Sequence, residues 1–153
     1  MFKSIVVGTD GTERSSRAVV EAADLAAANE GAVLHIVSVQ KPMAASAIAS
    51  AEVAVAAPVG AELEWEEDAR QTLEGSLSVA ATSAARPGLT IETHARFGAP
   101  ADVLCDLAAH LQADLIVVGN RGMKGGRRLL GSVPNTVSHH APCSVLIVDT
   151  EDD

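Results

Sequence analysis

Glycines and a serine stand at fixed intervals after an apolar stretch in the last third of the chain. The apolar run 115–118 leads into Gly119, and Gly122 follows after two intervening residues. Eight residues then separate Gly122 from Gly131, which is followed at once by Ser132. Because glycine lacks Cβ, its backbone amide can approach a ligand closely. Amides from two such turns, a serine hydroxyl and a helix N-terminus form a cradle for phosphate, so the pattern predicts a nucleotide site on an α/β sheet.

Short apolar runs alternate with helical patterns on both sides of these glycines. Strands are predicted at 5–8, 33–39, 89–97, 114–119 and 144–150, and helices at 12–30, about 61–85, from Pro100 onward and at 133–140. This order predicts parallel strands joined by right-handed crossovers. The inward stripe of the helix at 61–85 is expected to contain Trp65, Ala69, Leu73, Leu77 and Ala84.

A second glycine turn, at residues 8–11, follows the first predicted strand. In open parallel sheets, ligands bind beyond the carboxyl ends of the strands, where the winding direction switches. If the strands that end at Gly8 and Gly119 are neighbours, both glycine turns line one crevice.

The composition fits a single globular domain over residues 1–153. The chain is 48% hydrophobic but contains only three aromatic residues, Phe2, Trp65 and Phe97. Its core must therefore consist of Val, Leu, Ile and Ala, which suits a parallel sheet covered by helices. The scarcity of aromatic residues also argues against single-stranded nucleic-acid binding, which depends on stacking.

Charge and hydropathy exclude several classes of partner. The formal net charge is −9, so no nucleic-acid partner is expected. No apolar run approaches the ~18 residues of a transmembrane helix, and no membrane association is expected. Met1 to Ile5 lead directly into the first strand without a signal-peptide layout, which favours a cytoplasmic location. Cys105 and Cys143 are expected to be buried free thiols in a reducing cytosol.

The stretch from Lys41 to Gly60 interrupts the alternation. It is rich in alanine, nearly uncharged, and has Pro42 and Pro58 near its ends. A long connection of this kind is often a mobile loop or a lid. The two interpretations are a surface segment with a helical stretch at 44–56, or a flap over the crevice that could also bind a partner.

Together, the strongest stretches resemble a universal stress protein of the UspA type. The resemblance spans nearly the whole chain and rests on 8–12, Val39, 97–100, 114–122, 130–135 and 141–148. It implies a three-layer, Rossmann-like fold of the adenine nucleotide alpha hydrolase-like kind, with five parallel strands in the order 3-2-1-4-5 and helices on both faces. It also implies a homodimer paired through the last strand, Ser144 to Thr150.

Some members of that family bind ATP, and their pattern is Gly, two residues, Gly, nine residues, Gly, then Ser or Thr. The residue types match here, but the second gap, 123–130, has eight residues. Gly125 and Gly126 within this gap could absorb the deletion, since glycine adopts unusual dihedral angles. The resemblance implies binding of ATP or another adenine nucleotide such as cAMP, with Mg²⁺ held mainly by the phosphates.

The resemblance assigns a role to each matched residue. Asp10 could hydrogen-bond the ribose or help to hold a phosphate-bound Mg²⁺; alternatively it is the N-cap of the following helix. The backbone of Val39 would meet the adenine edge, although Val39 could equally be an ordinary core valine. Ser132 would contact phosphate, or it could serve only as the N-cap of the helix at 133–140. The implied nucleotide-binding residues are Gly8, Thr9, Asp10, Val39, Gly119, Asn120, Arg121, Gly122, Gly131, Ser132, Val133 and Pro134.

A basic cluster lies beside the predicted cradle. It holds four of the chain's 11 Lys and Arg residues, which are Arg121, Lys124, Arg127 and Arg128. In an acidic protein, such a cluster would offset the repulsion of a polyanion, although a simply solvated loop is an equal alternative.

Other chemistry finds less support. The chain has neither a P-loop motif nor a dinucleotide fingerprint after the first strand. Adjacent histidines, His139 and His140, point about 100° apart on a helix and cannot easily share a metal. His35 and His94 have no partner at ligand spacing, so no metal site is predicted.

Three functions therefore remain open. The first is a stress-response module that binds ATP, turns it over slowly at most, and signals through its dimer. The second is a true enzyme, an ATPase or a phosphotransferase, for which Asp10 is the one candidate general base. The third is a nucleotide-free interaction protein. A variant of the first is a cAMP-selective binding protein.

Overall fold

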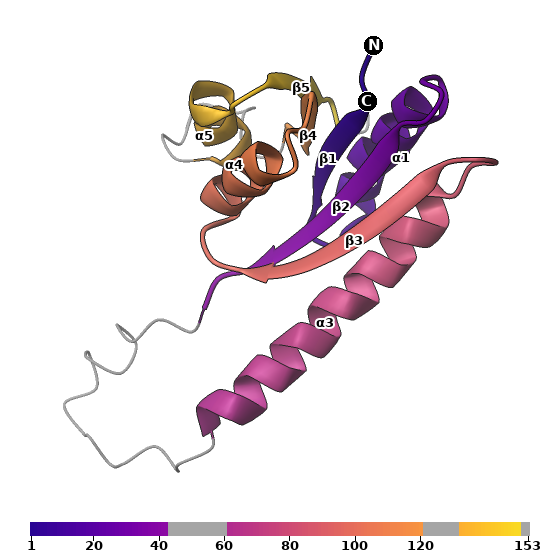
Figure 1. Cartoon of the computed structure of the whole chain (residues 1–153). Helices are drawn as coiled ribbons and strands as arrows, with labels where there is room; N and C mark the ends of the chain where they lie inside the picture. The colour runs from indigo at the N-terminus through magenta and orange to yellow at the C-terminus, as the bar shows by residue number, and fades with distance from the viewer. Residues whose placement is uncertain (43–60, 121–131, 151–153) are drawn as a thin grey trace.

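The computed structural model describes residues 1–42, 61–120 and 132–150 of the chain (Figure 1). Strands and helices alternate along these residues. In chain order they are β1 (Ser4–Thr9), α1 (Glu13–Ala27), β2 (Val33–Gln40), α3 (Ala61–Ala84), β3 (Thr90–Phe97), α4 (Pro100–His110), β4 (Leu115–Gly119), α5 (Val133–His140) and β5 (Ser144–Val148).

The five strands form one parallel sheet in the order β3-β2-β1-β4-β5, which confirms the predicted topology. β1 lies at the centre, where Val7 pairs with Ile36 of β2 on one side and with Val117 of β4 on the other. The chain winds outward from β1 in both directions, so the carboxyl ends of β1 and β4 are neighbours. This is the switch point at which a crevice is expected.

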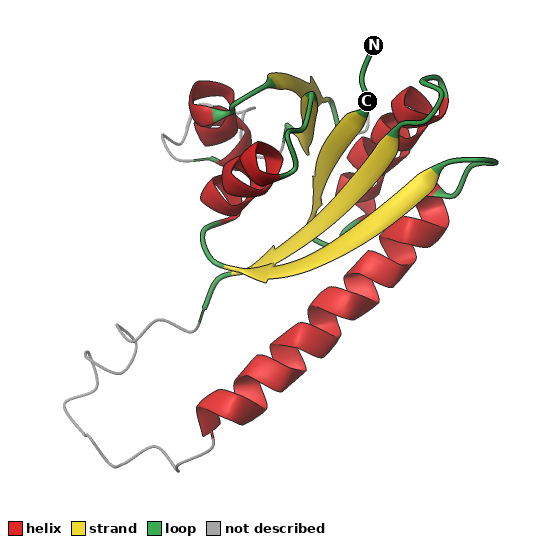
Figure 2. Cartoon of the chain, in the orientation of Figure 1, coloured by secondary structure: helices red, strands yellow, loops and turns green. Residues whose placement is uncertain are grey.

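Helices cover both faces of the sheet, which makes three layers (Figure 2). α1 and α3 pack on one face around Val7, and α4 and α5 pack on the other around Val6. Consecutive residues of β1 are therefore both fully buried, as expected for a strand between two helical layers. Alanines on the buried side of α1 allow that helix to lie close to the sheet.

α1 is shorter than the sequence pattern predicts. It begins after Thr12, whose side chain accepts a hydrogen bond from the Ser15 amide, and it ends at Ala27 instead of Glu30. The amide of Ala28 closes the last turn, and Gly31 then adopts a φ of 73°. The predicted helix was too long because alanines continue up to Ala28, and alanine favours a helix and gives no signal of where it ends.

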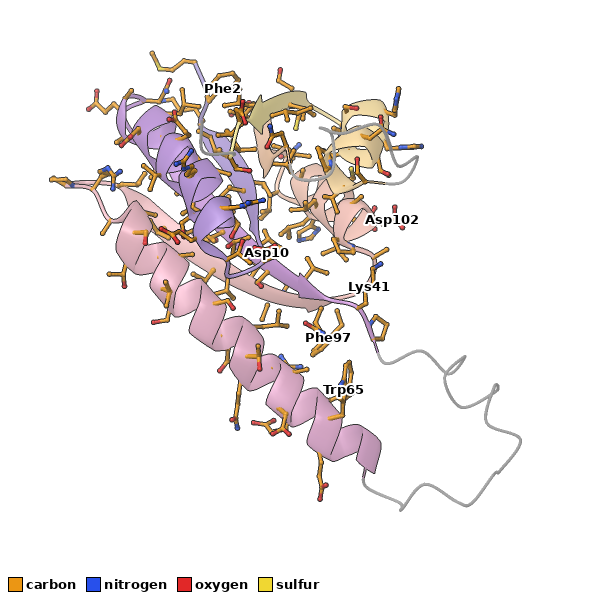
Figure 3. The ribbon with its side chains drawn as sticks, turned by 180° about the vertical axis from the view of Figure 1, so that it is seen from behind. Phe2, Asp10, Lys41, Trp65, Phe97 and Asp102 are labelled. Carbon is orange, nitrogen blue, oxygen red and sulfur yellow. The ribbon has the colours of Figure 1, made fainter. Side chains whose placement is uncertain are left out.

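α3 packs through the predicted stripe and extends past the sheet. Its buried residues recur every three or four positions and are Ala69, Leu73, Leu77, Ala80 and Ala84. Trp65 is only half-buried, and its ring lies 6.1 Å from that of Phe97 at the end of β3 (Figure 3). The predicted stripe is therefore confirmed, except that Trp65 packs on an aromatic ring beyond the two main core clusters.

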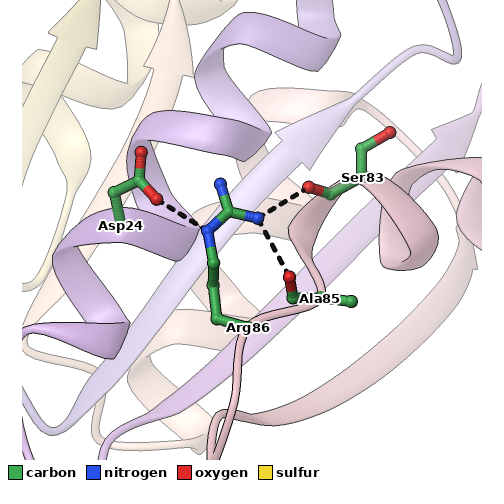
Figure 4. A network of polar contacts seen from close by, with 4 residues as sticks. All are labelled: Asp24, Ser83, Ala85 and Arg86. Carbon is green, nitrogen blue, oxygen red and sulfur yellow. Dashed lines mark hydrogen bonds and ion pairs between the residues drawn. The ribbon is translucent and has the colours of Figure 1, made fainter.

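An arginine joins the end of α3 to α1. Arg86 donates from Nε to the Asp24 carboxylate at 2.8 Å, and from a terminal nitrogen to the Ser83 and Ala85 carbonyls (Figure 4). The carbonyls at the end of α3 thus receive a cationic donor, which is favourable at a helix C-terminus.

The amino end of the sheet is held by a carboxylate. Asp114 Oδ2 accepts hydrogen bonds from the amides of Lys3 at 2.6 Å and Ser4 at 2.9 Å, which ties the start of β4 to the start of β1. These two hydrogen bonds hold the pKa of Asp114 below its ordinary value of 3.8. The contact lies at the opposite end of the sheet from the crevice.

None of the described helices combines the length and the hydropathy needed to cross a lipid bilayer. The predicted lid at 41–60 falls outside the described residues from position 43 onward, and the basic cluster at 121–128 falls outside them entirely. Those two predictions therefore remain predictions.

Candidate functional site

A cavity of about 410 Å³ opens where β1, β2 and β4 end. Its volume lies within the range of small-molecule sites, and its walls come from strand ends, the β1–α1 turn, α4 and the start of α5. Of the residues predicted to bind nucleotide, those lining it are Gly8, Thr9, Asp10, Val39, Gly119, Ser132, Val133 and Pro134.

Hydrogen bonds fix the β1–α1 turn on one side of this cavity. The buried hydroxyl of Thr9 accepts from the Gly11 amide at 3.2 Å and lies 3.0 Å from the Ser15 hydroxyl. Asp10 Oδ1 accepts from both the amide and the hydroxyl of Thr12, at 3.0 and 2.6 Å. The N-cap of α1 is therefore Thr12, and the alternative interpretation of Asp10 as the N-cap is wrong. Asp10 instead orients the capping residue and presents an exposed carboxylate at the cavity (Figure 3).

The wall formed by β2, β4 and α4 is apolar. Val37 and Val39 from β2 lie there with Leu104 from α4, and Val118 and Pro100 complete it. Val39 also packs against the core cluster under α4, so it is both a core valine and a lining residue. A flat apolar ring would bury its faces against this wall without leaving polar groups unpaired.

Neighbouring side chains disfavour a Cβ at Gly119 and, less strongly, at Gly8. A Cβ on Gly119 would lie 2.9 Å from Cγ2 of Thr150, and a Cβ on Gly8 would lie 3.1 Å from Cδ1 of Leu104. Neither glycine adopts a positive φ. The close packing of the two strand ends therefore explains both glycines without a ligand, in addition to the access that they give to the cavity.

Asn120 does not line the cavity in the described part of the chain. Its side-chain oxygen accepts from the amide and the hydroxyl of Thr150, at 3.1 and 3.0 Å, and its nitrogen donates to Asp149 at 2.7 Å. These bonds join the end of β4 to the residues after β5. They also hold the buried Thr150 against the cavity, where it is one of the lining residues that the sequence analysis missed.

The first turn of α5 closes the phosphate side of the predicted site. Ser132 occupies the N-cap position and its carbonyl accepts from the Thr136 amide, but its side chain makes no capping hydrogen bond among the described residues. The alternative in which its hydroxyl serves only to cap the helix is therefore not supported. The amides of Val133 and Asn135 precede the first intrahelical donor, and Pro134 has no amide hydrogen to leave unpaired.

Arg14 brings a cation to the cavity from the first turn of α1. Among the described lining residues it is the one positive charge, and Asp10 is the one carboxylate. The sequence analysis overlooked Arg14, although its place four residues after Asp10, at the start of a helix predicted to follow the glycine turn, could have indicated it. The remaining predicted residues, Arg121, Gly122 and Gly131, lie outside the described residues.

Comparisons with known proteins decide the family. The model of the universal stress protein family matches residues 1–149. Universal stress protein Rv1636 of Mycobacterium tuberculosis (strain ATCC 25618 / H37Rv) is 39% identical over 151 residues, with 97% of each chain covered. The chain belongs to the universal stress protein family.

Solved universal stress proteins share the fold. One in complex with cAMP matches with a TM-score of 0.76 at 34% identity, covering 98% of this chain and 99% of the other. The universal stress protein from Archaeoglobus fulgidus in complex with dAMP matches with a TM-score of 0.62 at 24% identity, covering 95% of this chain and 96% of the other. At that identity the second match supports the fold alone.

This universal stress protein also contains a polar cluster that its sequence did not reveal. Nδ1 of His35 lies 3.2 Å from Nε2 of His94, so the prediction that these histidines have no partner at ligand spacing is wrong. The prediction considered spacing along the sequence, whereas the pairing of β2 with β3 brings the two rings together.

The two cysteines of this family member are free thiols that are half-buried, not fully buried as expected. Burial raises the pKa of both thiols; the charge of Asp106 raises that of Cys105 further, and Cys105 and Asp114 raise that of Cys143 further. Both are therefore protonated near neutral pH and poorly nucleophilic.

Proposed function

We propose that the cavity binds an adenine nucleotide, with ATP as the ligand that its polar groups suit best. The observation that carries this proposal is the meeting of the β1–α1 turn, Gly119 at the end of β4, the first turn of α5 and Arg14 around one cavity of about 410 Å³. The relative solved in complex with cAMP, at 34% identity over nearly the whole chain, supports an adenine nucleotide as the ligand class.

The proposed orientation follows from the chemistry of the walls. The adenine ring packs against Val37, Val39 and Leu104, where an apolar surface is available. The phosphates lie toward Ser132 and the start of α5, because a helix N-terminus carries partial positive charge and unpaired amides. Arg14 then contacts the polyphosphate from the first turn of α1, so the site binds a polyphosphate more tightly than a monophosphate.

The donor set fits Mg²⁺ only as an ion shared with the nucleotide. Mg²⁺ prefers oxygen ligands and usually takes one or two carboxylates together with phosphate oxygens and water. Asp10 supplies the one carboxylate among the described lining residues. It would hold the ion beside the phosphates, and most ligands would come from the nucleotide and solvent.

The side chains that line the cavity favour binding of ATP with slow hydrolysis at most. Hydrolysis of ATP requires a group that orients or deprotonates the attacking water. Asp10 is the candidate among the described residues, and its Oδ1 already accepts two hydrogen bonds from Thr12. A cAMP-selective binding protein is the second candidate function, because the relative with cAMP matches this chain at a TM-score of 0.76.

Homodimerisation through β5 belongs to the same proposal. β5 is an edge strand of the sheet, paired only with β4 among the described residues. Val145, Leu146, Ile147 and Val148 are all half-exposed in the single chain. An edge strand with apolar side chains and unpaired backbone groups is suited to pairing with a second copy.

Isothermal titration calorimetry of the full chain with ATP, AMP and cAMP tests the proposed function. We expect one site per chain and tighter binding of ATP than of AMP in the presence of Mg²⁺. Ser132→Ala and Arg14→Gln should each weaken ATP binding about tenfold, since each removes a hydrogen bond to a charged group. Arg14→Gln should affect AMP less than ATP.

Arg70→Gln provides the matched control, because Arg70 is an exposed arginine of α3 that does not line the cavity. It should bind ATP like the unmodified chain. Tighter binding of cAMP than of ATP would instead support the second candidate function, a cAMP-selective binding protein. The absence of heat with all three nucleotides would overturn both.

A further inference from the structure

Three side chains that could bind a metal converge on the same side of the sheet as α4 and α5, toward the edge strand β3. His35 of β2 pairs in register with Glu92 of β3, and His94 follows two residues later on the same face of β3. The three potential ligand atoms are Nδ1 of His35, Oε2 of Glu92 and Nε2 of His94, and all lie within 4.8 Å of one another.

The separations suit ligands that share one ion. Nδ1 of His35 lies 3.2 Å from Nε2 of His94 and 3.3 Å from Oε2 of Glu92, and these last two atoms are 4.0 Å apart. A tetrahedral Zn²⁺ ion with bonds of about 2.0–2.1 Å holds its ligand atoms roughly 3.3 Å apart. The triangle is therefore close to one face of such a tetrahedron, and small side-chain rotations would complete it.

Hydrogen bonds within the cluster cannot join all three atoms at once: if Nε2 of His94 donates to Nδ1 of His35, Glu92 has no donor among the three. A neutral imidazole carries one N–H and one lone pair, so Nδ1 of His35 can direct one proton at most toward its two neighbours. If Nδ1 of His35 donates its proton to Glu92, then Nε2 of His94 either accepts a share of that same proton or points an N–H at another N–H. Three lone-pair atoms around one point are better matched by a cation than by a single proton.

We propose that His35, Glu92 and His94 form a binding site for a divalent transition-metal ion such as Zn²⁺. Two imidazoles and one carboxylate are an established ligand set for such ions. The ion would join the edge strand β3 to β2 at a point where no described side chain of another element is a ligand. A fourth position is left for water.

The surroundings of the cluster agree with this assignment. His35 is almost fully buried, His94 is mostly buried, and the Glu92 side chain is 54% exposed, so the open position faces solvent. α4 packs against β2 around Val37, whereas β3 is the edge strand of the sheet, and the Glu92 side chain on it is exposed (Figure 1). Solvent and ions can therefore reach the cluster from the side of β3.

Burial disfavours the charged form of both imidazoles. Burial lowers the pKa of His35 below its ordinary 6.5, against the opposing effect of Glu92. Burial also lowers the pKa of His94, and the nearby His35 and Arg96 lower it further.

The metal site lies beside the nucleotide cavity but is formed by different residues. Val37, which lines the cavity, comes two residues after His35 on β2 and is paired with His94 of β3. Two residues of an extended strand span roughly 7 Å. Because the two sites share no described residue, each can be tested with the ligand of the other site absent.

The test uses the purified full chain, stripped of metal with a chelator and free of nucleotide. Zn²⁺ binding is measured by calorimetry, and Co²⁺ is used as a spectroscopic probe, since its visible bands report four-coordinate geometry and nitrogen ligands. We expect one Zn²⁺ per chain. Because loss of even an outer-sphere partner costs about 10–100-fold in metal affinity, His94→Gln and Glu92→Gln should each weaken binding about 100-fold or more.

His110→Gln is the matched control, because His110 is an exposed histidine at the end of α4, outside the cluster. It should bind Zn²⁺ like the unmodified chain. His35→Gln should also lose the site, and circular dichroism will show whether this buried substitution still folds. Glu92→Gln keeps the test decisive whatever happens to His35→Gln, since Glu92 is exposed.

Two results would overturn the proposal. One is the absence of Zn²⁺ binding by the unmodified chain. The other is binding that persists unchanged in both His94→Gln and Glu92→Gln, which would place the ion elsewhere. Neither result depends on whether the chain binds ATP.

Discussion

The nucleotide cavity and the His35–Glu92–His94 cluster are built on the same strand, β2, but in different ways. The cavity lies at the carboxyl ends of the strands, and its polar residues come from turns and first helical turns directly after them. The cluster lies within the sheet, and its three residues come from the pairing of two neighbouring strands. In the first, the topology of the fold brings the groups together; in the second, the register of a single strand pair does so.

This difference has a consequence for robustness. The loops around the cavity can change in length while the strand ends stay fixed, because loops tolerate insertions and deletions better than strands. A one-residue shift of β3 against β2 would turn Glu92 and His94 to the other face and destroy the cluster. The cavity should thus be sensitive to changes at strand ends, and the cluster to changes in pairing.

Gly119→Ala is expected to have the largest effect, because it should disturb the cavity and leave the histidine cluster intact. Its Cβ would lie 2.9 Å from Thr150, so the end of β4 and the residues after β5 must move apart. We expect a loss of about 1–3 kcal/mol in the free energy of unfolding, measured with urea, and weaker ATP binding. Zn²⁺ binding should remain, because the β2–β3 pair is not involved.

Gly75→Ala is the matched control for that variant. Gly75 lies in α3, and a Cβ there would meet nothing within 4 Å. The substitution should stabilise the chain by about 0.5–1 kcal/mol, since alanine favours the helix more than glycine does. Equal urea midpoints for Gly119→Ala and the unmodified chain would show that the strand end can adapt, and that the cavity is less tightly constructed than described.

A smaller effect is expected from Asp114→Asn, at the amino end of the sheet, far from the cavity. The pKa of Asp114 is held below 3.8 by the amides of Lys3 and Ser4, so its charge stabilises the folded state above that pH. The stabilisation is lost as the pH falls below 3.8 and through the lower folded-state value. Because the carboxylate is exposed, we expect the variant to be less stable at pH 7 by at most about 1 kcal/mol.

Urea titrations at several pH values measure this contribution. The two proteins should converge in stability in acid, and both sites should be retained at neutral pH. A difference that grows as the pH falls would contradict the assigned role of Asp114.

The cavity at the strand ends could largely be predicted from the sequence, whereas the cluster formed by strand pairing could not. The sheet order followed from resemblance, and the elements followed from apolar runs and from breakers such as Pro100, which begins α4 as predicted. Eight of the twelve predicted nucleotide-site residues line the cavity, because they lie at the carboxyl ends of strands, directly after a strand, or at a helix start. Thr150 was missed, since nothing in the local sequence shows that the chain after β5 reaches the cavity. Arg14 was missed although its place at the start of the helix after the glycine turn could have indicated it.

The histidine cluster could not be predicted in the same way. His35 and Glu92 are 57 positions apart in the chain and become neighbours only through the pairing of β2 with β3. Strand pairing of that kind follows from the topology, but its register depends on packing on both faces of the sheet. Asn120 illustrates the same limit, because its partners Asp149 and Thr150 become neighbours only when β5 pairs with β4.

Nuclear magnetic resonance of the isotope-labelled chain tests most directly whether the carboxyl-end cavity is the nucleotide site. Amide resonances are recorded while ATP and Mg²⁺ are added. The account predicts that the largest shifts occur at Thr9, Val39 and Ser132, while Asp114, at the opposite end of the sheet, changes little. Shifts centred on the β2–β3 face away from the strand ends, or no shifts at saturating ATP, would contradict it.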